Sequence, residues 1–278
     1  MEPFTIGGDN GTAPVGVLVN PSGECEPQLL QIEAWARDLG LGIADLGTSA
    51  DPSDLSPGCQ LVIALGGDGT ILRALQLAMA HHAAVLGVNF GTVGFLADVD
   101  GDQLRGALDA IARGEAKVDA RTALMATMHA DPVIRAIAFN DVVIGRRPGH
   151  GTARLRVAVG GEPILALNGD GVVVASPTGS TAYTVGAGGP AVAPSLDAIV
   201  LTPLATQGSP LRSLVADGSD TIRIDLEPLS APVSVEIDGR MAHDIPASAA
   251  VEICAAPRKA RFVRTRPRTF YRDLAGRI

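Results

Sequence analysis

The segment Leu61–Leu72, LVIALGGDGTIL, most constrains how this chain can fold. Its first five residues, Leu61–Leu65, are all apolar, and such a run is typical of a strand buried on both faces of a parallel sheet. The next five residues, Gly66–Thr70 (GGDGT), contain three glycines, which let the backbone turn sharply and approach a ligand. Apolar residues at helical spacing follow. A glycine turn between a buried strand and a helix points backbone N–H groups outward, and phosphate is the usual occupant.

Length and composition allow one large domain or two ordinary ones, because the chain has 278 residues. Hydrophobic residues make up 46% and aromatic residues only 3%, so the core must be aliphatic. No apolar stretch approaches the ~20 residues of a membrane span. The segment Met1–Pro14 lacks the basic and apolar parts of a signal peptide, and we expect it to be a flexible leader.

The net charge of −8 argues against nucleic acid or an anionic membrane as a partner. The only lysines, Lys117 and Lys259, do not follow a glycine loop, so the Walker-type phosphate-binding motif is absent. Cys25, Cys59 and Cys254 are isolated in the sequence and fit neither a disulfide framework nor a zinc site. This cysteine pattern favours a reducing cytoplasm. No residue is assigned as a metal ligand.

The first part of the chain alternates strands and helices, which indicates an α/β domain over residues 1–119. We expect strands at Val15–Asn20, Leu41–Leu46, Leu61–Leu65 and Val85–Asn89, and helices at Pro27–Leu39, from Thr70 onward, and at Leu104–Ala112.

The character changes after about Val118, where short β-type runs replace the alternation. Two of the turns between them, Gly160-Gly161 and Asp238-Gly239, are typical of hairpins. These runs predict a β-rich, sandwich-like domain over residues 120–259. The tail, residues 260–278, is expected to pack back on the first domain.

Two further segments carry polar groups at the ends of apolar runs. The loop Asn89–Leu96 follows a buried strand as GGDGT does, so both loops would flank one crevice at the carboxyl ends of parallel strands. Its N-x-G-x-x-G pattern is not the dinucleotide fingerprint. The pair Asn140-Asp141 lies between two apolar runs and, considered alone, is typical of a solvated bend.

The richest stretch is Asp170–Tyr183, DGVVVASPTGSTAY. A short strand, Val172–Ala175, leads into Ser176–Thr181, where four hydroxyls surround a proline and a glycine. We interpret them as a cradle sized for a phosphate or a ribose. Tyr183 could pack against a base.

GGDGT alone resembles the signature of NAD kinases and of diacylglycerol- and sphingosine-type lipid kinases, and the 6-phosphofructokinases carry a variant. The order GGDGT, N-x-G-x-x-GFL, NDVVI, PTGSTAY, GGP, LTP and IDGR resembles the NAD kinase family from about Val15 onward. The other kinases lack the PTGSTAY stretch. The resemblance implies two domains with the active site between them. It also implies that ATP phosphorylates the 2′-hydroxyl of the adenosine ribose of NAD, giving NADP, with a divalent metal, expected to be Mg²⁺.

The resemblance also assigns roles to residues. Asp68 would be the base near the 2′-hydroxyl, with Gly69 lining the same contact, and Arg73 would meet phosphate. Asn140 and Asp141 would hold NAD. The other implied contacts are Asp170 at the nicotinamide end, the adenosine pocket of Thr181, Ala182, Tyr183, Thr184, Val185 and Gly186, and Ala205 and Arg240.

Three departures from the family pattern fall in or near this pocket. The family has Asn-Glu at Asn140-Asp141, often Ser at Gly186, and Pro-His-Ser-Leu near Leu204–Ser209. They leave open the hypothesis that the chain is a similar kinase that phosphorylates another adenine nucleotide or nucleoside. A third hypothesis is a non-catalytic nucleotide sensor, and the intact Asp68 argues against it. Polyphosphate is an alternative donor, and the family is commonly a homo-oligomer, a dimer or a tetramer.

Overall fold

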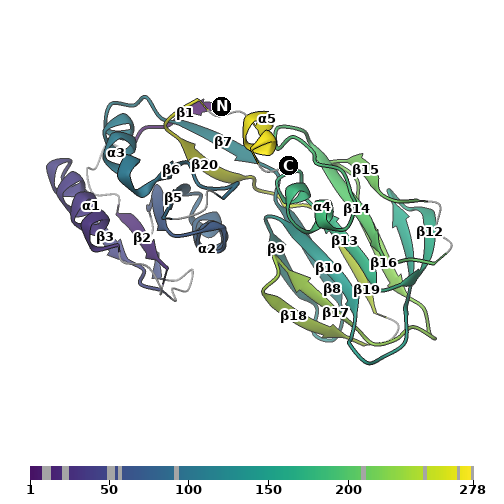
Figure 1. The fold of residues 1–278 in the computed structure, drawn as a ribbon. Coiled ribbons are helices and arrows are strands. Elements are labelled where there is room, and N and C mark those ends of the chain that lie inside the picture. The colour runs from purple at the N-terminus through teal and green to yellow at the C-terminus, as the bar shows by residue number, and fades with distance from the viewer. Residues whose placement is uncertain are drawn as a thin grey trace. The chain divides into compact units, whose positions relative to one another are not determined.

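The computed structural model describes residues 1–7, 14–20, 25–48, 54–55, 58–90, 94–207, 211–246, 249–267 and 270–276. The chain divides into two compact units, Met1–Ala120 with Ala260–Ile278, and Arg121–Lys259. Figure 1 labels most of their helices and strands. Within the described ranges, no helix is long and apolar enough to cross a membrane.

The first unit contains a mixed sheet and its helices. In chain order its elements are β1 (Glu2–Pro3), β2 (Val15–Val19), α1 (Glu26–Asp38), β3 (Ile43–Asp45), β4 (Leu61–Leu65), α2 (Asp68–His81), β5 (Ala84–Asn89), β6 (Val99–Asp100), a 3-10 turn (Gly101–Gln103), α3 (Leu104–Ala112), β7 (Lys117–Arg121), β20 (Ala260–Arg264) and α5 (Phe270–Ala275). The strand order is β1-β7-β20-β5-β4-β2-β3, with β6 beside β5.

The centre of this sheet is parallel, as the alternation of elements predicts, from β3 through β5 to β20. The edge differs, because β1 pairs antiparallel with β7. The expectation of a flexible leader is therefore wrong for the first residues. Phe4 is buried, and its N–H donates to the carbonyl of Ala116.

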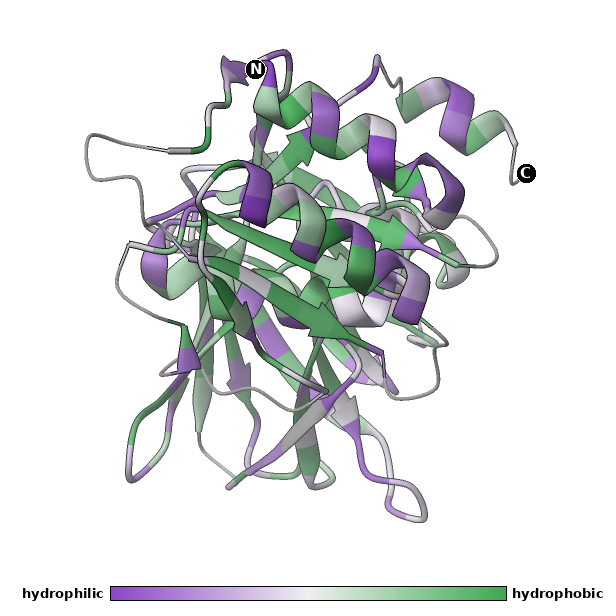
Figure 2. Cartoon of the chain, turned by 90° about the vertical axis from the view of Figure 1, so that its left-hand side faces the viewer, coloured by the Kyte–Doolittle hydropathy of each residue, from purple (hydrophilic) through white to green (hydrophobic). Residues whose placement is uncertain are grey.

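Strand β4 is buried along its whole length, as a central strand must be. Figure 2 shows hydrophobic residues along the central strands and mixed colours along the helices. Helix α2 starts at Asp68, two residues before the predicted start at Thr70. The turn is therefore only Gly66-Gly67, and the first helical hydrogen bonds run from Thr70 and Ile71 to Gly67.

The second unit is a sandwich of two antiparallel sheets. Its elements are β8 (Leu124–His129), β9 (Ile134–Ala138), β10 (Asp141–Arg146), β11 (Ala153–Val159), β12 (Glu162–Gly169), β13 (Gly171–Ala175), a 3-10 turn (Gly179–Thr181), α4 (Tyr183–Gly186), β14 (Ala198–Leu204), β15 (Leu214–Asp217), β16 (Ile222–Leu226), β17 (Val233–Ile237), β18 (Met241–Ile245) and β19 (Ala250–Ala255). The strand orders are β15-β14-β13-β10-β17-β18 and β12-β11-β16-β19-β8-β9.

One aliphatic core joins the two sheets, with members such as Val142 and Val174 from one and Leu155 and Ile253 from the other. This arrangement confirms the predicted sandwich. Strand β13 is also covered on its other face, where Val173 packs in a second cluster with Val192 and Val200. The strands β1, β6, β7 and β15 were not predicted. Strands β1 and β6 have two residues each and β15 has four, and in β7 the apolar residues alternate with polar ones.

Gly87 shows how tightly α2 packs on the sheet. A Cβ at Gly87 would lie 2.6 Å from Ile71 Cδ1 and 3.1 Å from Ala97 Cα. We expect Gly87→Ala to destabilise the protein by about 1–3 kcal/mol through overpacking. The matched control is Gly106→Ala in α3, where a Cβ meets nothing within 4 Å. This substitution should stabilise the protein by about 0.5–1 kcal/mol, because alanine has the higher helix propensity. Urea unfolding measures both variants. If the midpoints of Gly87→Ala and Gly106→Ala moved in the same direction relative to wild type, this packing would be contradicted.

Candidate active site

The carboxylate of Asp68 is fixed by the backbone of the second glycine loop. Its Oδ2 accepts the N–H of Phe95 at 3.0 Å, and its Oδ1 accepts the N–H of Leu96 at 3.2 Å. A carboxylate has about four acceptor sites, so two remain for a ligand. The sequence predicted that the two loops lie together, and these two hydrogen bonds join them.

The glycines around Asp68 differ in how much space surrounds them. A Cβ at Gly94 would lie 1.8 Å from Asp68 Oδ1, so only glycine lets the carboxylate reach the two N–H donors. A Cβ at Gly66 would lie 2.4 Å from Thr70 Oγ1. At Gly67 a Cβ would meet nothing within 4 Å. Packing within the chain therefore does not require glycine at Gly67.

Helix α2 presents its N-terminus and two more predicted residues beside Asp68. The N–H groups of Asp68 and Gly69 precede the first helical hydrogen bonds and have no acceptor within the helix. Arg73 lies about one turn further on and is partly buried. N–H groups, the helix dipole and a guanidinium together make a site for an anionic group such as phosphate.

In the second unit, one carboxylate organises the Asn140-Asp141 bend. Asp238 lies in the turn after β17, with a φ of 49°. Its carboxylate accepts the N–H groups of Phe139 (3.0 and 3.1 Å), Asn140 (2.7 Å) and Asp141 (3.2 Å). The sequence predicted the hairpin turn but not this role. Arg240 follows in the same turn and is exposed.

The PTGST loop packs directly on this bend. The carbonyl of Asn140 accepts the N–H of Ser176 at 2.9 Å. A Cβ at Gly179 would lie 1.9 Å from that same carbonyl oxygen, so the approach requires glycine. The loop and the bend therefore hold each other in place.

The predicted cradle of four hydroxyls is wrong for two of them. Both serines are fully buried. Ser176 Oγ donates to the carbonyl of Phe139, and Ser180 Oγ donates to the carbonyl of Pro177 and accepts the N–H of Val192. They stabilise the loop. Thr181 Oγ1 donates to the carbonyl of Thr178 at 3.3 Å. Within the described residues, only Thr178 and Thr184 among the hydroxyls of this loop and α4 are buried without a hydrogen-bond partner.

Helix α4 divides the predicted adenosine pocket into exposed and buried positions. Thr184 points inward and is fully buried. The remaining residues of the stretch from Ala182 to Gly186 are exposed, and Tyr183 keeps 48% of its surface accessible. The chain thus places an exposed tyrosine ring next to the Asn140-Asp141 bend, since the N–H of Tyr183 is hydrogen-bonded to the Asp141 carboxylate.

Asp170 and Ala205 lie elsewhere. The register pairs Asp141 with Ala175 and Gly145 with Gly171, so Asp170 lies at the opposite end of β13 from the PTGST loop. Five residues of strand make that separation about 17 Å. Asp170 Oδ1 pairs with Arg146 Nε at 2.5 Å, a partner that the sequence did not indicate. Ala205 directly follows β14 at this same side, with a φ of 45°.

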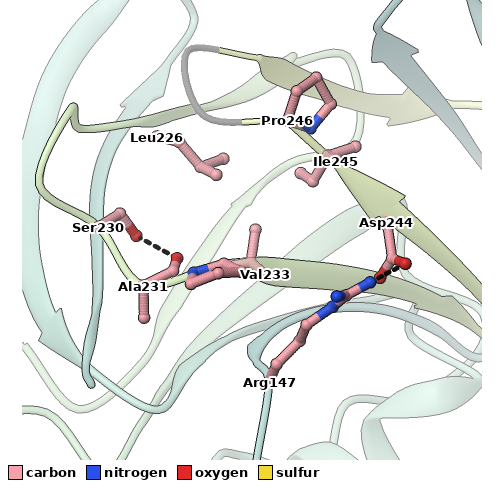
Figure 3. Close-up of a pocket in the computed structure, with 9 residues that line it drawn as sticks. Arg147, Leu226, Ser230, Ala231, Val233, Asp244, Ile245 and Pro246 are labelled. Carbon is pink, nitrogen blue, oxygen red and sulfur yellow. Dashed lines mark hydrogen bonds and ion pairs between the residues drawn. The ribbon is translucent and has the colours of Figure 1, made fainter. Parts of the chain in front are cut away.

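A pocket in the second unit is separate from these residues (Figure 3). Its volume is about 420 Å³. Arg147 and Asp244 form an ion pair at its wall, and apolar side chains such as Leu226, Val233 and Ile245 line the rest. None of the predicted site residues, all of which are described, lines this pocket. It is therefore not part of the candidate site.

Burial gives Asp141 unusual acid–base behaviour. Burial, and next the negative charge of Asp238, raise the pKa of Asp141 to about 7, although the N–H of Tyr183 opposes the shift. The pKa of Asp238 is also raised by its burial. The interpretation of this bend as solvated is wrong for Asp141, which is only 4% exposed.

This raised pKa predicts a pH-dependent stability. The folded protein binds more protons than the unfolded chain between the unfolded and folded pKa values, so its stability falls as the pH rises across that range. Asp141→Asn keeps an acceptor for Tyr183 but cannot ionise. From pH 5 to pH 7.5, wild type should lose about 2 kcal/mol more than Asp141→Asn. Exposed Asp102→Asn is the control, and parallel curves for wild type and Asp141→Asn would contradict the assignment.

Solved structures share this fold. The crystal structure of yeast NADH kinase with NADH is 22% identical, with a TM-score of 0.84 over 96% of this chain and 87% of that one. An NAD kinase from Archaeoglobus fulgidus in complex with ATP is 23% identical, with a TM-score of 0.78 over 95% of this chain and 97% of that one. At these identities the match establishes the fold.

Family models and sequence relatives agree with it. Residues 50–116 match the ATP-NAD kinase N-terminal domain, and residues 139–265 match the C-terminal domain. The NAD kinase of Rhodococcus erythropolis is 38% identical over 238 residues, 84% of this chain and 76% of the relative. That of Heliobacterium modesticaldum is 34% identical over 279 residues, 95% of this chain and 98% of the relative. These matches confirm the resemblance seen in the sequence: the chain belongs to the ATP-NAD kinase family.

Proposed function

We propose that this chain transfers the γ-phosphoryl group of ATP to the 2′-hydroxyl of the adenosine ribose of NAD, with Asp68 as the base. Phosphorylation of NAD by ATP is the reaction of the family to which the chain belongs. The observation that carries the residue assignment is the double N–H contact to the Asp68 carboxylate. It fixes a charged acceptor at the start of a helix suited to phosphate.

The transfer exchanges one phosphorus–oxygen bond for another. The 2′-oxygen forms a bond to the γ-phosphorus, and the bond from that phosphorus to the β,γ-bridging oxygen breaks, releasing ADP. The hydroxyl proton passes to the Asp68 carboxylate. Such transfers need little covalent help, so orientation and charge stabilisation dominate. The α2 N-terminus and Arg73 provide positive charge for a phosphate group.

The nucleotide contacts fall to the second unit. Asn140, Asp141 and the exposed part of Thr181–Gly186 would hold the adenosine, with Tyr183 offering a ring face and Arg240 a charge. Gly186 is open, since a Cβ there meets nothing within 4 Å. Asp170 and Ala205 lie at the far end of β13. We propose that the chain works as a homo-oligomer in which these two contact the nucleotide held by another copy.

A divalent metal, expected to be Mg²⁺, fits this chain as part of the substrate. Within the described ranges, no cluster of three or more His, Cys, Asp or Glu is placed to hold a metal ion. Mg²⁺ commonly binds substrate phosphates with few protein ligands, so the residues suit a metal that arrives on ATP. It would neutralise phosphate charge there. Free cysteines at Cys25, Cys59 and Cys254 suit a reaction in the cytoplasm.

The acceptor and the donor are tested together. The purified chain should phosphorylate NAD with ATP, with kcat/KM for NAD exceeding those for NADH and adenosine by about tenfold or more. Polyphosphate replaces ATP in a parallel series. A higher kcat/KM for NADH or adenosine would assign the site to another adenine compound. Binding without turnover of any acceptor would indicate a sensor.

A further inference from the structure

The C-terminal strand returns to the loop that holds Asp68. Arg264 is the last residue of β20, and its side chain is 5% exposed. Its Nη1 donates to the carbonyl of Leu96 at 3.2 Å and lies 3.5 Å from the carbonyl of Ala97. Leu96 is the residue whose N–H donates to Asp68 Oδ1. One arginine therefore fixes the peptide groups next to the donors that fix the carboxylate.

The next residues strengthen the same attachment. Thr265 donates both its N–H (2.9 Å) and its hydroxyl (2.7 Å) to Asp98 Oδ2. Arg266 Nε donates to the carbonyl of Asp98 at 2.8 Å. The N–H of Asp98 in turn donates to the carbonyl of Gly87 in β5. The stretch from Leu96 to Asp98 is thus held from the C-terminal segment and from the sheet.

The guanidinium has its charge balanced in place. Arg264 Nη1 lies 3.5 Å from Asp98 Oδ1, and Nε lies 3.6 Å from Asp119 Oδ2. Its Cζ lies 5.2 Å from the centre of the Phe262 ring. A planar fork of donors can serve carbonyls and carboxylates at once, whereas a lysine ammonium offers a single charged point.

We propose that Arg264 is a positioning residue for Asp68: through the Leu96 and Ala97 carbonyls it sets the Phe95 and Leu96 N–H groups, and through them the orientation of the carboxylate toward the acceptor hydroxyl. This inference rests on the proposed role of Asp68 as the base. The side chain of Arg264 is almost fully buried, so in this proposal it acts through the loop and not by contact with substrate. It should therefore affect kcat far more than the KM of either substrate.

The test is a double-mutant cycle with Arg264→Lys and Asp68→Asn. Arg264→Lys keeps the charge beside Asp98 and Asp119 but loses the fork. In the wild-type background it should lower kcat about tenfold, because small displacements of a reacting group are costly. In the Asp68→Asn background the loss should shrink to less than about twofold, since the group it positions is gone. Both KM values should stay within about twofold.

Arg261→Lys is the matched control. Arg261 lies on the same strand, and its Nη1 donates to the carbonyl of His82, at the other end of α2, at 2.6 Å. It should leave kcat unchanged in both backgrounds. Hydrogen exchange of the Phe95 and Leu96 amides gives a readout without activity: it should accelerate in Arg264→Lys and not in Arg261→Lys.

Thr265→Val provides a second variant if Arg264→Lys does not fold. It is nearly isosteric and removes only the hydroxyl bond to Asp98, so it should give a smaller loss with the same dependence on Asp68. Equal losses in both backgrounds, or unchanged amide exchange, would overturn the positioning role alone. An Asp68→Asn variant with wild-type turnover would overturn the role of Asp68, and this inference with it.

Discussion

The hydrogen bonds from the Phe95 and Leu96 N–H groups to the Asp68 carboxylate are the interaction on which the candidate site depends. Asp68 opens helix α2 two glycines after a buried strand, so the sheet fixes its backbone. Its side chain is fixed separately, by a loop that leaves the neighbouring strand β5. The absence of a Cβ at Gly94 makes the contact possible. A charged acceptor is thereby held rigid before any substrate binds, as efficient transfer requires.

The second unit uses the same device in a different place. Asp238 collects three consecutive backbone N–H groups and so shapes the Asn140-Asp141 bend. Backbone donors are well suited to this purpose, because they are anchored by the strands on either side. The cost is a second carboxylate near Asp141, and that charge, together with burial, raises the pKa of Asp141 to about 7.

Local patterns in the sequence predicted most elements and a few of the contacts. The bounds of β4 follow from an unbroken apolar run and those of α3 from helical spacing, and the Asp238-Gly239 turn follows from turn chemistry. The Asp68 contacts could not be predicted, because every residue except proline carries a backbone N–H and the sequence does not indicate which of them binds a side chain. The hydroxyls of Ser176 and Ser180 illustrate the converse. A loop rich in hydroxyls suggests a ligand-binding site, but these two bind backbone groups of the folded chain. The attachment by Arg264 joins residues 168 positions apart, which no local pattern reports.

The central claim is that Asp68 acts as the base, and turnover by Asp68→Asn tests it most directly. Asparagine keeps the size of the side chain but removes its charge and basicity. Steady-state phosphorylation of NAD should fall about 10²–10⁴-fold in kcat. Calorimetry should find NAD bound with an affinity within about threefold of wild type, because most of the proposed nucleotide contacts belong to other residues. Turnover close to the wild-type rate would show that Asp68 is not the base and that GGDGT serves only to bind phosphate.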